Sequence, residues 1–176
     1  MKLVIGVISL ILATTSIFIF DFTSESDLTN WFVVDDVVMG GRSEGRFFLN
    51  QDGHAVFTGQ ISLQNNGGFS SVRYGFEPLS VKAYNSCVIR VRGDGKSYQF
   101  RVKSNQYDRA SYVRYFQTSG NWQTIEIPFA QMYPTFRGMK LDQPNFPGIV
   151  MEEIAFLIGN KNAETFKLEI DFIQLK

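Results

Sequence analysis

Two stretches of the chain alternate strictly between apolar and polar side chains. Residues 97–103 read Ser-Tyr-Gln-Phe-Arg-Val-Lys, and residues 166–172 read Phe-Lys-Leu-Glu-Ile-Asp-Phe. Successive side chains of a β-strand point to opposite faces, so this period of two predicts strands with one buried and one solvated face. A chain organised in this way has to pair its strands into sheets that cover a common apolar core.

Further short apolar runs lie between segments of turn-forming residues. The breaks contain Gly-Gly, Asp-Gly, Asn-Gly-Gly and Gly-Asn, in which glycine and asparagine favour tight turns. Many short strands at regular spacing are typical of a sandwich or barrel, so the predicted fold class is all-β, with a β-sandwich as its architecture. We expect the additional strands at 18–22, 46–49, 55–58, 61–63, 69–73, 87–91, 112–117, 122–127 and 154–158.

Two segments depart from this pattern. Residues 24–30 favour one or two helical turns, because Ser24 can cap a first turn that contains Glu25 and Asp27. Residues 132–150 contain three prolines. We expect them to form the longest irregular loop, a place where sandwiches often carry binding residues.

Composition limits both the size of the protein and its chemistry. A chain of 176 residues is long enough for one domain, and its 17 Phe residues supply ample apolar surface for a core. The 17 basic and 17 acidic residues balance, so nucleic-acid binding gains no support from charge. Cys87 is the only cysteine and His54 the only histidine. A disulfide within the chain is therefore excluded, as are metal sites that need several cysteines or two histidines.

Residues 1–16 form a separate segment. Lys2 precedes an apolar run at 3–12, and small residues follow at 13–16, which is the layout of a cleavable secretory signal. Apolar residues resume at 17–20, so the whole stretch also approaches the ~20 residues of a membrane anchor. A plain extension of the first strand is the third alternative. We expect a signal peptide or membrane anchor at 1–16, which would engage a membrane if uncleaved, and a β-sandwich domain at 17–176.

Four glycine-centred stretches occur in order along this domain. They are residues 35–43, 65–73, 90–95 and 134–138, with Trp31 before them, residues 122–128 between the last two, and residues 166–173 at the end. In this order and spacing the chain resembles the complex I intermediate-associated protein 30 (CIA30) family, over roughly residues 20–175. The resemblance implies a galactose-binding-domain-like jelly-roll β-sandwich without enzymatic activity. Mitochondrial members of this family help to assemble respiratory complex I.

Two features depart from the family pattern. The N-terminus looks like an export signal, so we expect a bacterial protein with this segment to be exported, periplasmic or membrane-anchored. That location differs from the matrix-type setting in which complex I is assembled. Residues 162–166 lack the Gly-Pro that often precedes the final strand in the family.

Charged residues near the motif glycines are the candidate binding residues. An arginine fork can clamp a carboxylate, a phosphate or the backbone carbonyls of a partner. The same arginines can instead pair with the aspartates of these motifs and hold glycine-rich loops in place. An aromatic ring in the polar loop 105–108 is expected to be exposed. The predicted partner-binding residues are Arg42, Arg73, Arg92, Arg137, Asp36, Asp94 and Tyr107.

Other chemistries draw on the same polar residues. Asp35, Asp36 and Asp94 are the oxygen ligands available to calcium, but no Asp-x-Asp-x-Asp-Gly loop is present, and we predict neither a metal nor a cofactor. A glycosidase needs two carboxylates across a cleft, for which Asp36 with Glu126 or Glu169 is the available pair. Both glutamates fall on the expected solvated face, so we predict no catalytic residue.

Sugar sites combine aromatic platforms with polar side chains. Trp31, Tyr74, Tyr107 and Tyr133 are available for this role, whereas Trp122 is expected in the core. The sequence thus predicts a non-enzymatic, chaperone-like assembly factor that contacts respiratory-complex or other membrane-protein subunits. An exported carbohydrate-binding module is the alternative.

Overall fold

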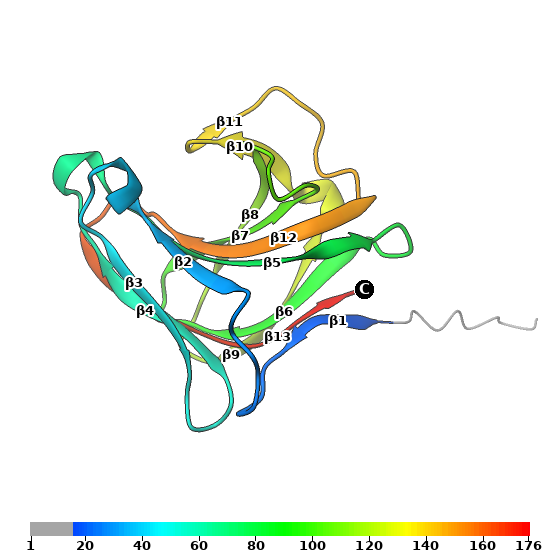
Figure 1. Ribbon diagram of the computed structural model, residues 1–176, viewed down its shortest axis with the longest axis horizontal. Coiled ribbons are helices and arrows are strands. Elements are labelled where there is room, and N and C mark those ends of the chain that lie inside the picture. The colour runs from blue at the N-terminus through cyan, green and yellow to red at the C-terminus, as the bar shows by residue number, and fades with distance from the viewer. Residues whose placement is uncertain (1–15) are drawn as a thin grey trace, which may run out of the picture.

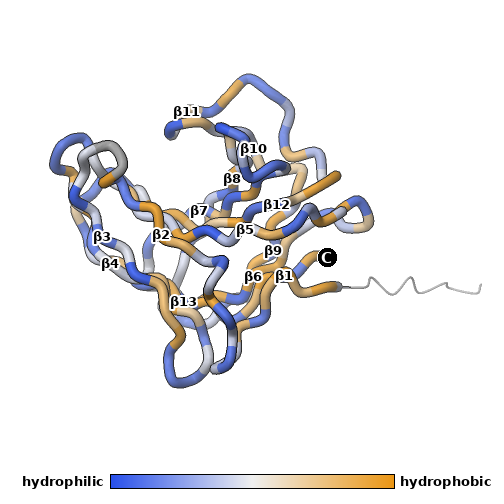
Figure 2. Tube along the Cα trace, in the orientation of Figure 1, coloured by the Kyte–Doolittle hydropathy of each residue, from blue (hydrophilic) through white to orange (hydrophobic). Residues whose placement is uncertain are grey.

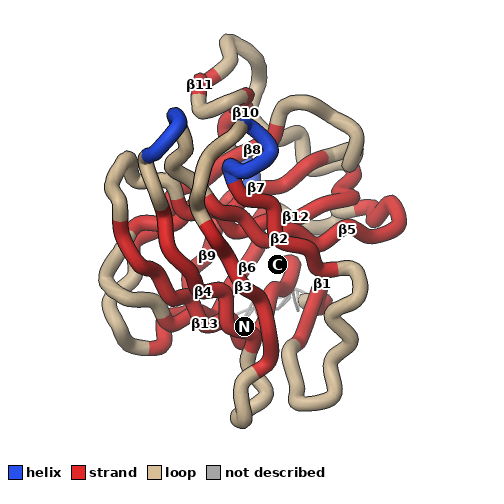
Figure 3. Tube along the Cα trace, turned by 60° about the vertical axis from the view of Figure 1, so that its left-hand side comes forward, coloured by secondary structure: helices blue, strands red, loops and turns tan. Residues whose placement is uncertain are grey.

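The computed structural model describes residues 16–176, which form two antiparallel sheets packed face to face (Figure 1). Short 3-10 turns occur only in the loops between strands: η1 (Asp36–Met39), η2 (Gln64–Asn66) and η3 (Phe129–Gln131) (Figure 3). The strands are β1 (Ile17–Asp21), β2 (Trp31–Asp35), β3 (Glu44–Leu49), β4 (Ala55–Ile61), β5 (Ser70–Ser80), β6 (Ser86–Arg92), β7 (Ser97–Lys103), β8 (Ser111–Gln117), β9 (Trp122–Pro128), β10 (Tyr133–Phe136), β11 (Met139–Lys140), β12 (Val150–Ile158) and β13 (Glu164–Leu175).

The chain passes repeatedly from one sheet to the other, with hairpins at β3–β4, β7–β8 and β10–β11. The six-stranded sheet has the order β3-β4-β13-β6-β9. Strand β1 pairs with the end of β13, along the same edge that β4 occupies further back. The seven-stranded sheet has the order β11-β10-β8-β7-β12-β5-β2. This arrangement confirms the predicted jelly-roll β-sandwich.

The core fills the space between the sheets with the apolar half of each alternating strand. Phe57 and Phe166 pack edge to face in the six-stranded sheet, and Phe100 and Phe156 do so in the seven-stranded sheet. All four rings are buried, and full burial of such a side chain stabilises the fold by about 1.5–3 kcal/mol. In Figure 2 hydrophobic and hydrophilic residues alternate along many strands.

The predictions for local structure were wrong in four places. The separate strand expected at 61–63 does not form, because Ile61 is the last residue of β4 and residues 62–63 lie in the loop that follows. Residues 24–30 form turns, because the side chains of Ser26 and Asp27 bond nearby backbone groups and compete with a helix. Strand β2 was missed, since its run Trp-Phe-Val-Val-Asp shows no clear alternation. The expected irregular loop at 132–150 contains β10 and β11, which extend the seven-stranded sheet beyond β8.

The predicted signal or anchor at 1–16 lies outside the described residues, apart from Ser16. None of the helical turns in residues 16–176 has the length and apolar character that a bilayer crossing requires.

Candidate functional site

The seven-stranded sheet is curved, and its outer face lies on the inside of the curve. In Figure 1, β8, β10 and β11 rise from the layer formed by β7, β12, β5 and β2, so the sheet curves around its own outer face. Lys103 and Glu153 point to this face, since their strand neighbours Val102 and Ile154 belong to the core between the sheets. Both charged residues are nevertheless buried. We call this inner surface of the curve the concave face.

One row of side chains crosses the concave face from strand to strand. Ala155 of β12 pairs with Arg73 of β5 on one side and with Arg101 of β7 on the other. Arg101 in turn pairs with Val113 of β8, and Val113 with Tyr133 of β10. The alternation that builds the core on one side of these strands therefore aligns two arginines on the other.

Glu153 is the carboxylate that these cations share. Its Oε1 lies 3.7 Å from NH1 of Arg73 and 3.8 Å from Nζ of Lys103. Burial raises the pKa of Glu153, although the three neighbouring cations oppose the shift. One partly desolvated carboxylate thus serves two cations at distances longer than a good hydrogen bond.

Arg101 has no carboxylate of its own. Its NH1 donates to Oε1 of Gln99 at 2.7 Å, and its NH2 donates to Oγ1 of Thr135 at 3.4 Å. Within residues 16–176, no carboxylate oxygen lies within 4.0 Å of its guanidinium. Burial, reinforced by the charge of Arg73, lowers the pKa of Arg101 to about 10. Burial also lowers the pKa of Lys103.

Tyrosines border this charged row. The hydroxyl of Tyr115 accepts a hydrogen bond of 3.0 Å from Nε2 of Gln99. Tyr115 itself is 48% exposed. Tyr133 is half-buried, and burial raises its pKa. The concave face therefore combines fixed cations, an amide and aromatic rings within one sheet.

Asp36 ties together two of the glycine-centred motifs. Its buried carboxylate accepts hydrogen bonds from the backbone and hydroxyl of Ser43, and from the backbone N–H groups of Gly68 and Phe69. Burial favours the neutral acid, but these four bonds outweigh it and lower the pKa of Asp36. The same packing requires glycine at position 67, because a Cβ there would lie 2.5 Å from Oδ2 of Asp36.

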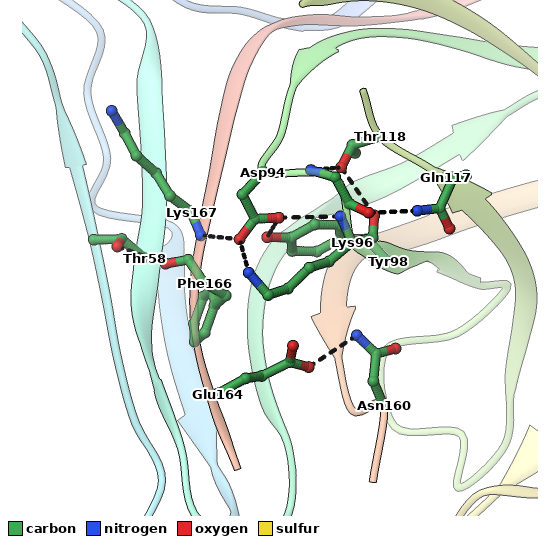
Figure 4. A network of polar contacts seen from close by, with 11 residues as sticks. Thr58, Asp94, Lys96, Tyr98, Gln117, Thr118, Asn160, Glu164, Phe166 and Lys167 are labelled. Atoms are coloured by element: carbon green, nitrogen blue, oxygen red, sulfur yellow. Dashed lines mark hydrogen bonds and ion pairs between the residues drawn. The ribbon is translucent and has the colours of Figure 1, made fainter. Parts of the chain in front are cut away.

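Asp94 has a similar role at the β6–β7 turn (Figure 4). Its carboxylate accepts bonds from Nζ of Lys96 at 2.8 Å, from the hydroxyl of Tyr98 at 3.0 Å and from the backbone of Lys167 at 3.0 Å. These contacts outweigh burial and lower the pKa of Asp94. The turn is thereby fixed to β13.

Arg92 lies on the outer face of the other sheet, away from the concave face. It pairs with Glu169 and its guanidinium lies 5.1 Å from the ring centre of Trp122. Arg92 and Asp94 line one shallow pocket of about 240 Å³ together with Lys167 and Glu169. The prediction that Trp122 belongs to the core is wrong, because its strand pairing with Arg92 directs it outward.

The remaining predicted residues lie in exposed loops. Arg42 is exposed after η1, and Tyr107 is 85% exposed between β7 and β8. Arg137 occupies the β10–β11 turn with its guanidinium 5.4 Å from the ring centre of Phe136. The structure thus distributes the predicted set over both sheets, and only Arg73 belongs to the concave face.

The sequence also suggested ion pairs between the candidate arginines and the aspartates of the motifs, and the structure gives two of these arginines other partners. Of the predicted arginines, Arg73 pairs with Glu153 and Arg92 pairs with Glu169, and neither uses an aspartate of the motifs. Over residues 16–176, no three His, Cys, Asp or Glu side chains are grouped to hold a metal ion. Sequence reasoning missed Arg101, Lys103 and Glu153, although a glutamate inside the apolar strand β12 was a usable signal.

The fold is shared with solved β-sandwiches. The family 11 carbohydrate-binding module of a cellulosomal cellulase of Clostridium thermocellum matches 93% of this chain and 95% of its own, with a TM-score of 0.68 and 16% identity. The agarase AgWH50C matches 92% of this chain and 24% of its own, with a TM-score of 0.63 and 12% identity. The protein is therefore a galactose-binding-domain-like jelly-roll sandwich.

The sequence comparisons assign the family. The model of the Complex I intermediate-associated protein 30 family matches residues 20–170, and the chain belongs to this family. The mitochondrial complex I intermediate-associated protein 30 of Drosophila melanogaster is 27% identical over 90% of this chain and 62% of its own length. The Mus musculus protein is 27% identical over 88% of this chain and 54% of its own length. The chain thus spans less than two thirds of either relative.

Proposed function

We propose that this protein is a non-enzymatic assembly factor that holds a polypeptide partner against its concave face. The names of the Drosophila and mouse relatives support a role with respiratory complex I intermediates. Subunits of that complex, or of another membrane-protein complex, are the proposed partners.

The observation that carries this proposal is the curvature of the seven-stranded sheet around an outer face on which Lys103 and Glu153 are buried (Figure 1). The side chains of this face project from paired strands, so they are held in place before a partner arrives, and little conformational entropy is lost on binding. The row from Arg73 to Tyr133 crosses five neighbouring strands, a width that suits a polypeptide segment. The exposed loop residues Arg42, Arg137 and Tyr107 are proposed as outer contacts.

Site-specific photo-crosslinking tests this role. A photoreactive amino acid replaces Tyr115 on the concave face or, as the matched control, the exposed Thr124 on the opposite sheet. Crosslinks from position 115 to respiratory-complex subunits, with none from position 124, would support the proposal. Crosslinks from position 124 alone, or no protein crosslink in native membrane and envelope fractions, would refute it.

An exported carbohydrate-binding module is the second candidate. Tyr115, Tyr133 and Gln99 lie together on the concave face, and sugar sites use this combination of aromatic rings and amides. Binding of a neutral glycan at micromolar to millimolar concentration, together with a mature N-terminus near Ile17, would favour this candidate over the assembly role.

A further inference from the structure

Two arginines flank a small side chain on the concave face. Arg73 and Arg101 are both paired with Ala155, on opposite sides of β12. Strands lie about 4.8 Å apart, so the two arginine Cα atoms are about 10 Å apart. The methyl group of Ala155 forms a low floor between them, and both side chains are long enough to reach a single group placed above it.

The charges around this floor do not balance. Arg73, Arg101 and Lys103 supply three cations, while Glu153 supplies the one carboxylate within ion-pair distance of them among residues 16–176. Removing a cation from water is unfavourable unless a fixed anion compensates. Glu153 is already shared by Arg73 and Lys103, so Arg101 is the one of these three cations without a carboxylate of the described chain within 4.0 Å.

Resting on the function proposed above, we propose that Arg101 and Arg73 bind a side-chain carboxylate of an acidic polypeptide segment laid across the concave face. A guanidinium presents parallel N–H donors that match the two oxygens of a carboxylate. Such a ligand supplies the missing negative charge and leaves the Glu153 contacts in place. A neutral partner would leave Arg101 desolvated and without a counter-charge.

The test uses the purified protein and two synthetic peptides of equal length. One peptide alternates glutamate with serine, and the other has glutamine in place of each glutamate. Titrations are followed by calorimetry and by the side-chain Nε–Hε signals of Arg101 and Arg73 in nitrogen-15 NMR spectra. Arg101→Met removes the charged guanidinium and keeps an unbranched apolar stem. The matched control is Arg46→Met, which removes an exposed arginine from β3 in the other sheet.

We expect the glutamate peptide to shift the Arg101 signal, and the glutamine peptide to leave it unchanged. Arg101→Met should weaken glutamate-peptide binding by about tenfold or more, since a charge-assisted pair is lost, while Arg46→Met should not. Arg101→Lys should bind with intermediate affinity, because lysine keeps the charge and loses the fork. The denaturation midpoint of Arg101→Met should be unchanged or higher, because a desolvated charge has been removed.

Equal binding of the two peptides, or equal affinities of Arg101→Met and Arg46→Met, would overturn the inference. So would a shift of the Arg101 signal by oligogalacturonate but not by the glutamate peptide, since the occupant would then be an acidic sugar. A partner that crosslinks at position 115 equally well in Arg101→Met would overturn this inference alone and leave the assembly role intact. If the glutamate peptide bound but no protein were crosslinked, the assembly role alone would be refuted.

Discussion

The carboxylate of Asp36 accepts a hydrogen bond of 2.5 Å from the backbone N–H of Gly68, a residue 32 positions further along the chain. The same carboxylate binds Ser43 in the loop before β3. Two glycine-rich loops that are distant in sequence are thereby fixed to one buried anion.

Replacement of Asp36 by alanine should lower the free energy of unfolding by about 2–4 kcal/mol, because buried donors of Ser43, Gly68 and Phe69 lose their acceptor. Urea denaturation measures the change. Asp142→Ala serves as the control, since that residue is exposed. A loss of less than about 0.5 kcal/mol for Asp36→Ala would show that the loops are held by other contacts.

The contribution of Asp36 should depend on pH. Its pKa is lowered in the folded protein, whereas the unfolded chain takes up the proton near its ordinary value of ~3.9. The stabilisation is therefore complete above about pH 4 and is lost as the pH falls through the lower folded pKa. The difference in unfolding free energy between the unmodified protein and Asp36→Asn should shrink on acidification from pH 7 to about pH 3. A difference that stays constant over this range would contradict the assignment.

Gly67→Ala should destabilise the protein by about 1–3 kcal/mol, because the new Cβ would lie 2.5 Å from Oδ2 of Asp36. Gly75→Ala is the matched control, since its Cβ would meet nothing closer than Oε1 of Gln106 at 3.5 Å. Thermal unfolding of the two variants makes the comparison. Equal midpoints would mean that the loop shifts to accept the methyl group.

Glu153→Gln should lower the free energy of unfolding by about 3 kcal/mol, because the buried Lys103 and the partly buried Arg73 lose their shared carboxylate. Added salt should restore part of this loss by screening the cations from one another. The control is Glu77→Gln, an exposed residue of β5. Denaturation at low and high salt tests both statements, and a loss that is independent of salt would argue against repulsion as its cause.

The period of two in the sequence was sufficient to predict most strands and the sandwich architecture. It worked where apolar and polar residues alternate, as in β7 and β13, and it failed for β2, whose apolar run has no polar face. β10 and β11 were missed because they are short, and β10 contains Pro134. Their pairing depends on contacts with β8 that no local pattern records.

The candidate site was less predictable than the fold. Alternation correctly placed Gln99, Arg101 and Lys103 on one face of a strand, but the expectation that this face is solvated was wrong for Lys103, which is buried. The curvature of the seven-stranded sheet creates the concave face, and curvature arises from long-range strand pairing. The motif aspartates stood out in the sequence because they hold loops together.

Strand β13 has consequences for how the chain is made. It is a central strand of the six-stranded sheet, pairing with β4 and β1 along one edge and with β6 along the other. The ribosome delivers β1, β4 and β6 long before residues 164–175, at ~5–20 residues per second. For several seconds of synthesis the nascent chain therefore exposes strand edges that β13 covers in the folded protein. This sheet can complete its folding only after β13 has been made. Until then the exposed edges are open to aggregation or to binding by cellular chaperones.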